Sequence, residues 1–256
     1  MSPSWFGSSP SPGALPTVNV IAEDVELAAA IDGERRDAAV RIGRALLLSI
    51  GLGEWNAAED AASTRGGYGL LVLSGLLVRQ VGIGRRLAAE LLAPGDLLRP
   101  HEHDGEEATL PFAATWRALY PLRLAVLDRR WSLRMAPFPE VSIELTGRAV
   151  RRSRRLANMM AISHCPRLDE RLLLLLWELA DRYGTVRSDG IHVPIPMTHE
   201  VLSHLAGARR PSVSVALGRL AETGRVIREA HGWLLRGEPP SPMPAADVTA
   251  WPADVT

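Results

Sequence analysis

The chain contains 256 residues, of which 46% are hydrophobic and 23% are charged, and its formal net charge at pH 7 is +0. This composition is typical of a globular protein, and the length allows two domains. No segment approaches eighteen consecutive apolar residues, and the N-terminus lacks the features of a secretory signal, so we expect a cytoplasmic protein without a membrane span. The single cysteine, Cys165, excludes an internal disulfide, a zinc site of cysteine pairs and an iron–sulfur cluster within one chain.

The N-terminal half has the pattern of a small β domain. Residues 1–17 are rich in Ser, Pro and Gly and are predicted to be disordered, and residues 20–42 favour one or two short helices. Short apolar runs then alternate with turns, at 45–50, 69–73, 76–81, 86–92, 112–120 and 122–128. Many short strands at regular spacing predict a β-sandwich or a barrel-like roll.

This half offers little support for catalysis. The Gly-Ile-Gly at 82–84 lacks the following helix and further glycines of a phosphate loop, and the seven histidines follow no nucleophile motif. One alternative stays open, because His101 and His103 on a strand would place both rings on one face of it. Glu102 and Asp104 would add carboxylates, giving the ligands of a cupin-like metal-binding enzyme. The segment HEHDGEE looks instead like an exposed acidic loop, so we expect no enzyme, no metal site and no cofactor.

Residues 140–163 are predicted to form one long helix after the β domain. Its apolar positions step around one face, and they are Val141, Leu145, Ala149, Leu156 and Met160. A long helix with an apolar seam between two domains predicts a dimer interface, and the alternative is a helix packed on its own domain. Arginines crowd its middle, at positions 148, 151, 152, 154 and 155, and we interpret them as a solvated face.

A helix-turn-helix is predicted near residues 198–220. Thr198 can cap a first helix, Gly207 interrupts the pattern where a tight turn would need glycine, and Pro211 lies in the first turn of a second helix. The apolar positions of both helices recur at helical spacing, and they are Val201, Leu202, Leu205, Val213, Ala216, Leu217 and Leu220. An ordinary helical hairpin would show the same pattern.

The surroundings favour a winged helix-turn-helix. A short strand at 190–195 precedes the motif, and two strands at 225–229 and 233–236 follow it around a turn at 230–232. Between residues 195 and 237 the chain contains six Arg and three Glu, a local charge of +3 in a neutral chain. A locally basic module fits a surface that binds phosphates.

The predicted fold class is therefore α+β, with an N-terminal β-roll, a long dimerisation helix and a C-terminal winged helix-turn-helix. Asp169 can cap a helix that runs to Tyr183 and packs beneath the motif. The predicted boundaries are 1–17 for a disordered N-terminus, 18–136 for the roll, 137–164 for the dimerisation helix, 165–237 for the winged helix-turn-helix and 238–256 for a disordered tail.

This order of elements resembles the Crp/Fnr superfamily of bacterial transcription regulators over roughly residues 20–237. The segment Leu91–Leu98, LLAPGDLL, looks like the family's turn in the roll, and THEVLSHLAGARRPSVSVALGRLAETG looks like its DNA-reading segment. The residues RRPSVSVALGRL are typical of a high-GC actinobacterial branch. The resemblance implies a homodimer with an N-terminal roll like a cyclic-nucleotide-binding domain and a C-terminal reading head.

The resemblance further implies sequence-specific binding of double-stranded DNA at an inverted-repeat operator, with RNA polymerase as a candidate further partner. The family's base-contacting positions fall on Arg210, Pro211 and Val215, and its phosphate-contacting positions fall on Arg209 and Ser212. The predicted DNA-binding residues are Arg209, Arg210, Pro211, Ser212, Ser214, Val215 and Arg219. The family often has Glu and Arg where this chain has Pro211 and Val215, so we expect an operator that departs from the best-known consensus.

The effector cannot be named from the sequence. Members that bind cyclic nucleotides have a Glu for the ribose and an Arg-Ser or Arg-Thr pair for the phosphate after the Pro-Gly-Asp turn. In the corresponding segment here, LLRPHEHDGEEATLPFAAT, the single arginine is Arg99, and four acidic residues follow it. Because carboxylates would repel a buried phosphate, we expect an effector other than cyclic AMP. Two alternatives stay open: a nucleotide- or other small-ligand-gated regulator with a non-standard pocket that uses Arg99 or Glu102, and a roll that binds a protein partner.

Overall fold

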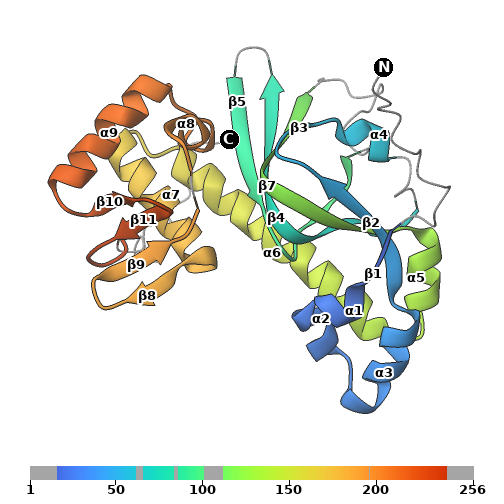
Figure 1. Cartoon of the computed structure of the whole chain (residues 1–256). Helices are drawn as coiled ribbons and strands as arrows, with labels where there is room; N and C mark the ends of the chain where they lie inside the picture. The colour runs from blue at the N-terminus through green and yellow to red at the C-terminus, as the bar shows by residue number, and fades with distance from the viewer. Residues whose placement is uncertain (1–15, 62–65, 84–85, 101–111, 196, 241–256) are drawn as a thin grey trace, which may run out of the picture. The chain divides into compact units, whose positions relative to one another are not determined.

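The computed structural model describes residues 16–61, 66–83, 86–100, 112–195 and 197–240, and the chain divides into two compact units, 1–156 and 157–256 (Figure 1). The predictions for residues 1–15, for the metal-ligand candidates at 101–104 and for the tail from 241 onward lie outside the described residues. In the described part of the chain, every helix is too short or too polar to cross a membrane.

The N-terminal unit contains an antiparallel sheet and several helices. The strands are β1 (Thr17–Asn19), β2 (Arg44–Ile50), β3 (Gly53–Trp55), β4 (Gly69–Ile83), β5 (Arg86–Leu92), β6 (Leu97–Leu98) and β7 (Ala113–Leu127). The helices are α1 (Val20–Glu23), α2 (Val25–Ala30), α3 (Gly33–Ile42), α4 (Ala57–Ala61), α5 (Arg129–Met135) and α6 (Pro139–Ser163), the last of which continues into the C-terminal unit. Residues 20–42 thus form three short helices, whereas the sequence predicted one or two.

The sheet has the order β1-β2-β7-β4-β5, with β3 added to β7 and β6 added to β4. The long strands β4 and β7 pair with each other along most of their lengths, and each also pairs with two different short strands at its two ends. Sharing partners in this way bends the sheet over itself, which confirms the predicted roll (Figure 1).

The prediction of separate strands at 69–73 and 76–81, and at 112–120 and 122–128, was wrong, because β4 and β7 are continuous. The register between them shifts at Val72, Ser74 and Leu76, so a local irregularity bends the strand without ending it. Gly75 lies at this bend with φ +96, and a Cβ there would lie 2.3 Å from the carbonyl oxygen of Pro121. The glycine that indicated a turn is therefore required for close approach of two strands.

Alternate residues of β4 and β7 face two different cores, because successive strand side chains point to opposite faces. Leu70 and Leu124 lie inside the roll with Trp55, Leu77 and Trp116. On the opposite face, a second core is built from strand and helix residues, namely Leu71, Ala125, Leu127, Ile21, Leu27, Trp131, Phe138, Val141 and Leu145. The second core attaches the helices, including the start of α6, to the roll.

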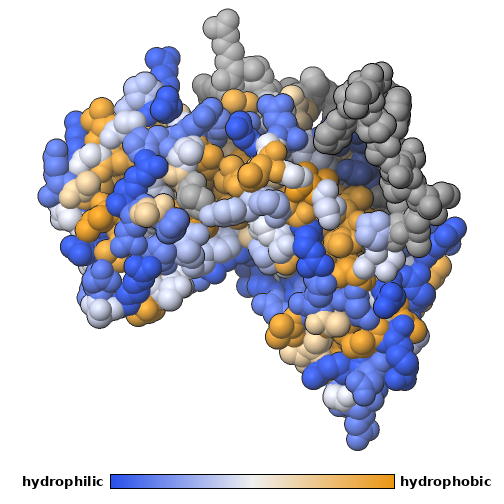
Figure 2. All heavy atoms as spheres, viewed as in Figure 1, coloured by the Kyte–Doolittle hydropathy of each residue, from blue (hydrophilic) through white to orange (hydrophobic). Residues whose placement is uncertain are grey.

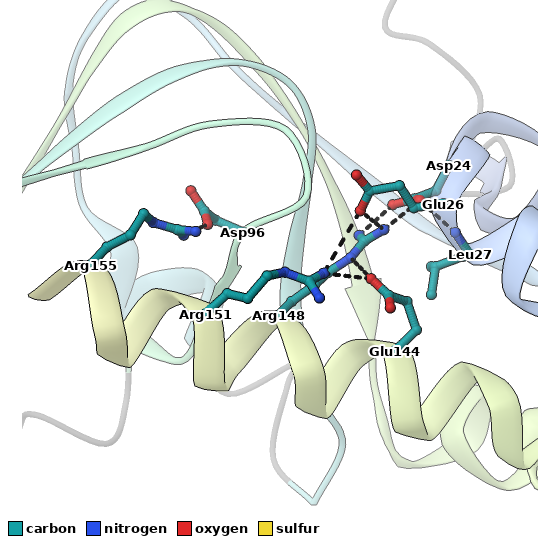
Figure 3. A network of polar contacts seen from close by, with 8 residues as sticks. All are labelled: Asp24, Glu26, Leu27, Asp96, Glu144, Arg148, Arg151 and Arg155. Atoms are coloured by element: carbon teal, nitrogen blue, oxygen red, sulfur yellow. Dashed lines mark hydrogen bonds and ion pairs between the residues drawn. The ribbon is translucent and has the colours of Figure 1, made fainter. Parts of the chain in front are cut away.

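The arginine-rich middle of α6 is a solvated face only in part, because Arg151 and Arg154 are exposed whereas the other arginines contact the N-terminal unit. Arg148 is only 5% exposed, and its guanidinium donates two hydrogen bonds to the Asp24 carboxylate at 2.6 and 2.7 Å (Figure 3). One of the two donating nitrogens, Nη2, also contacts Glu26, and Nε contacts Glu144, each at 3.1 Å. Burial disfavours the charge of Arg148, but the hydrogen bonds to Asp24 raise its pKa above the usual range. The interpretation from sequence failed because it did not include the acidic caps of the N-terminal helices.

Two further arginines, one and two turns along α6, bind the roll itself. Arg152 forms a bidentate pair with Glu90 and donates to the carbonyl oxygen of Leu97 at 2.7 Å. Arg155 pairs at 2.6 Å with Asp96, whose other oxygen accepts the amide of Ala93 (Figure 3). The Pro-Gly-Asp turn is thus held between its own backbone and α6.

The C-terminal unit contains α7 (Leu168–Tyr183), β8 (Thr185–Arg187), β9 (Gly190–Val193), α8 (His199–Leu205), α9 (Arg210–Glu222), β10 (Val226–Glu229) and β11 (Gly232–Leu235). The four strands form one antiparallel sheet in the order β10-β11-β9-β8. Helix α7 buries its leucine face as predicted, but its N-cap is Arg167, and Asp169 lies within the first turn, where it pairs with Arg167.

We predict that Arg148→Met will lower the free energy of unfolding by about 3–5 kcal/mol, because the Asp24 carboxylate would stay buried without its cation. Arg154→Met, an exposed arginine on the same helix, is the matched control and should change stability by less than about 0.5 kcal/mol. Urea unfolding followed by circular dichroism measures both values. Equal stability of the two variants would contradict the role of Arg148.

Candidate nucleic-acid interface

The helix-turn-helix forms as predicted from local signals. Thr198 caps α8, since its hydroxyl accepts the amide of Val201 at 3.2 Å. Gly207 adopts φ +60 in the turn, a conformation that glycine enters without steric cost. Pro211 lies in the first turn of α9, where its missing N–H is not needed.

Helix α9 is fixed by its apolar face, and the opposite face is exposed. Val213, Ala216, Leu217 and Leu220 are buried in the C-terminal unit. Each predicted DNA-contacting residue is exposed, namely Arg209, Arg210, Pro211, Ser212, Ser214, Val215 and Arg219. Figure 2 shows hydrophilic and hydrophobic groups interspersed over the face of this unit where α9 lies. The arrangement presents cations, small polar groups and one exposed valine together along one helix.

The wing adds further cations beside this helix. Strands β10 and β11 pair in register from Val226 with Leu235 to Glu229 with Gly232, which confirms the predicted hairpin. The guanidinium carbon of Arg228 lies 5.7 Å from the centre of the Trp233 ring, and this cation–π contact orients an exposed arginine. Glu229, the acid on this strand, is engaged by Arg187 at 3.1 Å and by His192 at 3.2 Å.

One residue of this surface was missed from the sequence. Nδ1 of His199 lies 2.8 Å from Oγ of Ser214, so the ring joins the start of α8 to the exposed face of α9. The same ring lies 6.4 Å from the Trp233 ring, at an angle of 33°. The sequence could have predicted this contact, because His199 directly follows the cap Thr198. It therefore lies in the first turn of α8, which faces α9.

The N-terminal unit contains a cavity of about 340 Å³ between the roll and α6. Its walls combine aromatic, aliphatic and cationic side chains, among them Tyr68, Trp116, Leu145, Arg79, Arg99 and Arg152. Arg79 is 8% exposed, its guanidinium stacks on Trp116 at 5.5 Å, and its Nε has no hydrogen-bond partner among the described residues. Burial and the neighbouring Arg152 lower the pKa of Arg79, and Glu90 only partly offsets them.

The other cavity arginines are already engaged. Arg152 is bound to Glu90 and to the backbone of Leu97, and Arg99 donates to the backbone oxygens of Gly67 and Tyr68. Within the described residues, acidic, histidine and cysteine side chains do not gather into a cluster that could hold a metal ion. The chemistry of this cavity therefore centres on a buried cation beside an aromatic wall.

The predicted dimer residues do not share one environment. Val141 and Leu145 are buried in the core of their own unit, so their side chains are not available to another chain. Ala149 lines the cavity, whereas Leu156 and Met160 are exposed. Another outward face of α6 exposes Ile143 and Val150 instead.

Comparison with known families and proteins agrees with this architecture. A family model described as the Crp-like helix-turn-helix domain matches residues 170–236. The regulatory protein CysR of Synechococcus elongatus is 28% identical over 104 residues, which are 40% of this chain and 50% of that protein. The CRP-like cAMP-activated global transcriptional regulator of Mycobacterium tuberculosis is 28% identical over 162 residues, covering 61% of this chain and 69% of that protein. The chain thus spans half the length of the first relative.

Solved structures share the fold. A protein from Listeria monocytogenes that contains a cyclic nucleotide-binding domain aligns over 82% of this chain and 96% of its own, with a TM-score of 0.61 at 14% identity. TTHB099, a CRP-family transcriptional regulator from Thermus thermophilus, aligns over 73% and 91%, with a TM-score of 0.52 at 22% identity. The combination defines a class, namely proteins with a cyclic-nucleotide-binding-like roll and a helix-turn-helix. Within that class, the chain is similar to Crp/Fnr-type transcription regulators, and its residues 170–236 match the Crp-like helix-turn-helix domain.

Two glycines of the helix-turn-helix should respond oppositely to alanine. Gly207→Ala forces a Cβ into the left-handed region and should destabilise the protein by about 1–2 kcal/mol. Gly218→Ala, in the interior of α9 with open space around it, should stabilise the protein by roughly 0.5–1 kcal/mol through helix propensity. Thermal unfolding of both variants checks the pair, and a shift of the same sign in both would contradict the assigned backbone conformations.

Proposed function

We propose that this chain is a sequence-specific DNA-binding transcription regulator that acts as a homodimer on an inverted-repeat operator. The observation that carries this proposal is the exposed face of α9, where Arg209, Arg210 and Arg219 stand among small side chains. A helix of this kind can enter the major groove, where an arginine can bind guanine N7 and O6. The exposed wing arginines Arg225 and Arg228 would then meet the phosphate backbone.

The experiment is selection of bound duplexes from a random pool, followed by affinity measurements. Arg210→Ala should cost about 1–3 kcal/mol of discrimination and relax the preference at one base of each half-site. Arg209→Ala, which removes a proposed phosphate contact, should weaken all sequences alike and leave the selected motif unchanged. An unchanged motif for Arg210→Ala would overturn this docking of α9.

The homodimer is proposed to form along α6, through a seam that differs from the one expected from the sequence. Ile143 and Val150 are seven residues apart and remain 71% and 48% exposed, as expected for one side of a two-helix seam. Continuing the heptad spacing adds exposed residues, and the proposed seam is Ile143, Thr146, Val150, Ser153, Ala157 and Met160. Small residues between larger ones would allow two helices to approach closely.

Val150→Asp and Met160→Asp should each abolish dimerisation, because a charge would be buried in the seam. Leu133→Asp is the matched control, since Leu133 is equally apolar and 63% exposed but lies on α5. Sedimentation velocity measures the oligomeric state, and the selected sites should be inverted repeats with half-sites about 10 base pairs apart. A monomeric wild-type protein, or a motif without dyad symmetry, would overturn the proposal.

The cavity of the N-terminal unit is the proposed effector site, and the effector is proposed to be a small organic anion with an apolar body. The Nε–H group of buried Arg79 has no hydrogen-bond partner among the described residues. An anion in the cavity could accept from this group, and it would stabilise the guanidinium charge that burial disfavours. Trp116 and Leu145 would cover the apolar part. The mycobacterial relative is cAMP-activated by name, but the arginines beside this cavity other than Arg79 are bound to protein atoms.

We therefore expect no saturable heat when cyclic AMP or cyclic GMP is titrated into the protein. The fluorescent sulfonate 8-anilinonaphthalene-1-sulfonate should bind, and Arg79→Met should weaken it about tenfold through loss of a charge-assisted hydrogen bond. Arg154→Met, on the exposed side of α6, should leave its affinity unchanged. Stoichiometric, micromolar binding of cyclic AMP would contradict this effector class.

A further inference from the structure

His199 occupies a position where three parts of the C-terminal unit meet. The residue begins α8, its Nδ1 is within hydrogen-bond distance of Ser214 on α9, and its ring lies against Trp233 on β11. Arg228 of β10 covers the same Trp233 ring. The imidazole therefore lies between the exposed helix and the wing, the two elements that the proposed DNA complex uses.

The charges that act on this imidazole are cationic. Burial is the largest influence on His199, followed by Arg228 of the wing and Arg210 of α9, and all three lower its pKa. Packing from β11 contributes Trp233, which does not titrate. The nearby acid of β10, Glu229, is paired with Arg187 and His192, and Glu200 follows His199 on α8 as an exposed side chain. In the free protein these groups thus disfavour the protonated form of the His199 ring.

We assign the titrating nitrogen from the hydrogen-bonding groups around Ser214, because the roles of the two ring nitrogens of His199 depend on the tautomer. The Ser214 hydroxyl has one hydrogen, and it donates that hydrogen to the carbonyl oxygen of Arg210 at 3.2 Å. Oγ then accepts from Nδ1–H of His199 at 2.8 Å. Nε2 is the nitrogen that gains a proton, and protonation there leaves the contact with α9 intact while it adds a second N–H donor.

From this arrangement we propose that His199 takes up a proton when the C-terminal unit binds DNA, which makes DNA binding by this chain stronger as the pH falls. The inference rests on the proposed function. Phosphates that approach Arg210 and Arg228 compensate the charges that lower the pKa of His199, and they attract the imidazolium directly. The pKa of His199 therefore rises on binding. Affinity increases as the pH falls through the interval between the bound and free pKa values, and it is constant above and below that interval.

The test measures affinity for the selected duplex between about pH 5.5 and about pH 8 at fixed ionic strength, the range in which histidine titrates. Calorimetry in buffers of different ionisation enthalpy counts the protons taken up, and the uptake should be largest, at up to one proton per chain, midway between the free and bound pKa values. His199→Gln should bind DNA with no proton uptake. His164→Gln, an exposed histidine at the end of α6, should retain the wild-type value.

A second variant and a spectroscopic readout guard against loss of folding in His199→Gln. Ser214→Ala removes the hydrogen-bond partner but keeps the imidazole, so its proton uptake should persist. The NMR shift of the His199 ring protons should titrate at higher pH with DNA than without it. Tight DNA binding without proton uptake, or proton uptake by His199→Gln equal to that of the wild-type protein, would overturn this inference but not the proposed function. Absence of specific DNA binding at every pH would overturn the proposed function with it.

Discussion

The buried pair between Arg148 and Asp24 is the contact on which the N-terminal unit depends. Asp24 also caps α2 through the amide of Leu27, so one carboxylate serves a helix end and a guanidinium together. A buried cation tolerates no rotation away from its partner, because the loss of either charge leaves the other desolvated. The pair therefore fixes α6 about its own axis. Val141 and Leu145 must then face the core, and Ile143 and Val150 must face outward.

The same constraint determines what the cavity can bind. Arg152 and Arg155 are used to attach α6 to Glu90 and to the turn at Asp96, so their charges are compensated by the roll. Cations that hold a helix in place cannot bind a ligand without releasing the helix. Arg79 differs, because its guanidinium is stacked on Trp116 and lies 3.6 Å from Glu90, which Arg152 already engages. Among the described residues, Arg79 is thus a buried cation whose charge is only partly compensated, which is why the proposed ligand carries an anionic group.

The C-terminal unit could be predicted closely from the sequence because its signals are local. A cap, a glycine turn and an apolar stripe each act within a few residues, and the helices begin and end near the predicted positions. The roll was predicted as a class, but the continuity of β4 and β7 depends on pairing between distant residues around Gly75. Helix α6 shows a second limit. Periodicity identifies apolar faces, but α6 has two, and only the acids at Asp24, Glu90 and Asp96 select the inner one.

His199 illustrates why a reading surface cannot be derived from helix periodicity alone. The periodicity of α9 places Ser214 on the exposed face, but it does not determine the direction in which the Ser214 hydroxyl points. In the folded unit, Ser214 is hydrogen-bonded to the His199 ring, which lies beside Trp233, and the Trp233 ring also orients Arg228. Side chains on α8, α9 and the wing are therefore coupled through one imidazole and one indole. Because rotation of either ring would move groups on two elements, the spacing between α9 and the wing is a property of the packed unit. Complementarity to a duplex, whose groove and phosphates lie at fixed separations, requires a spacing of this kind.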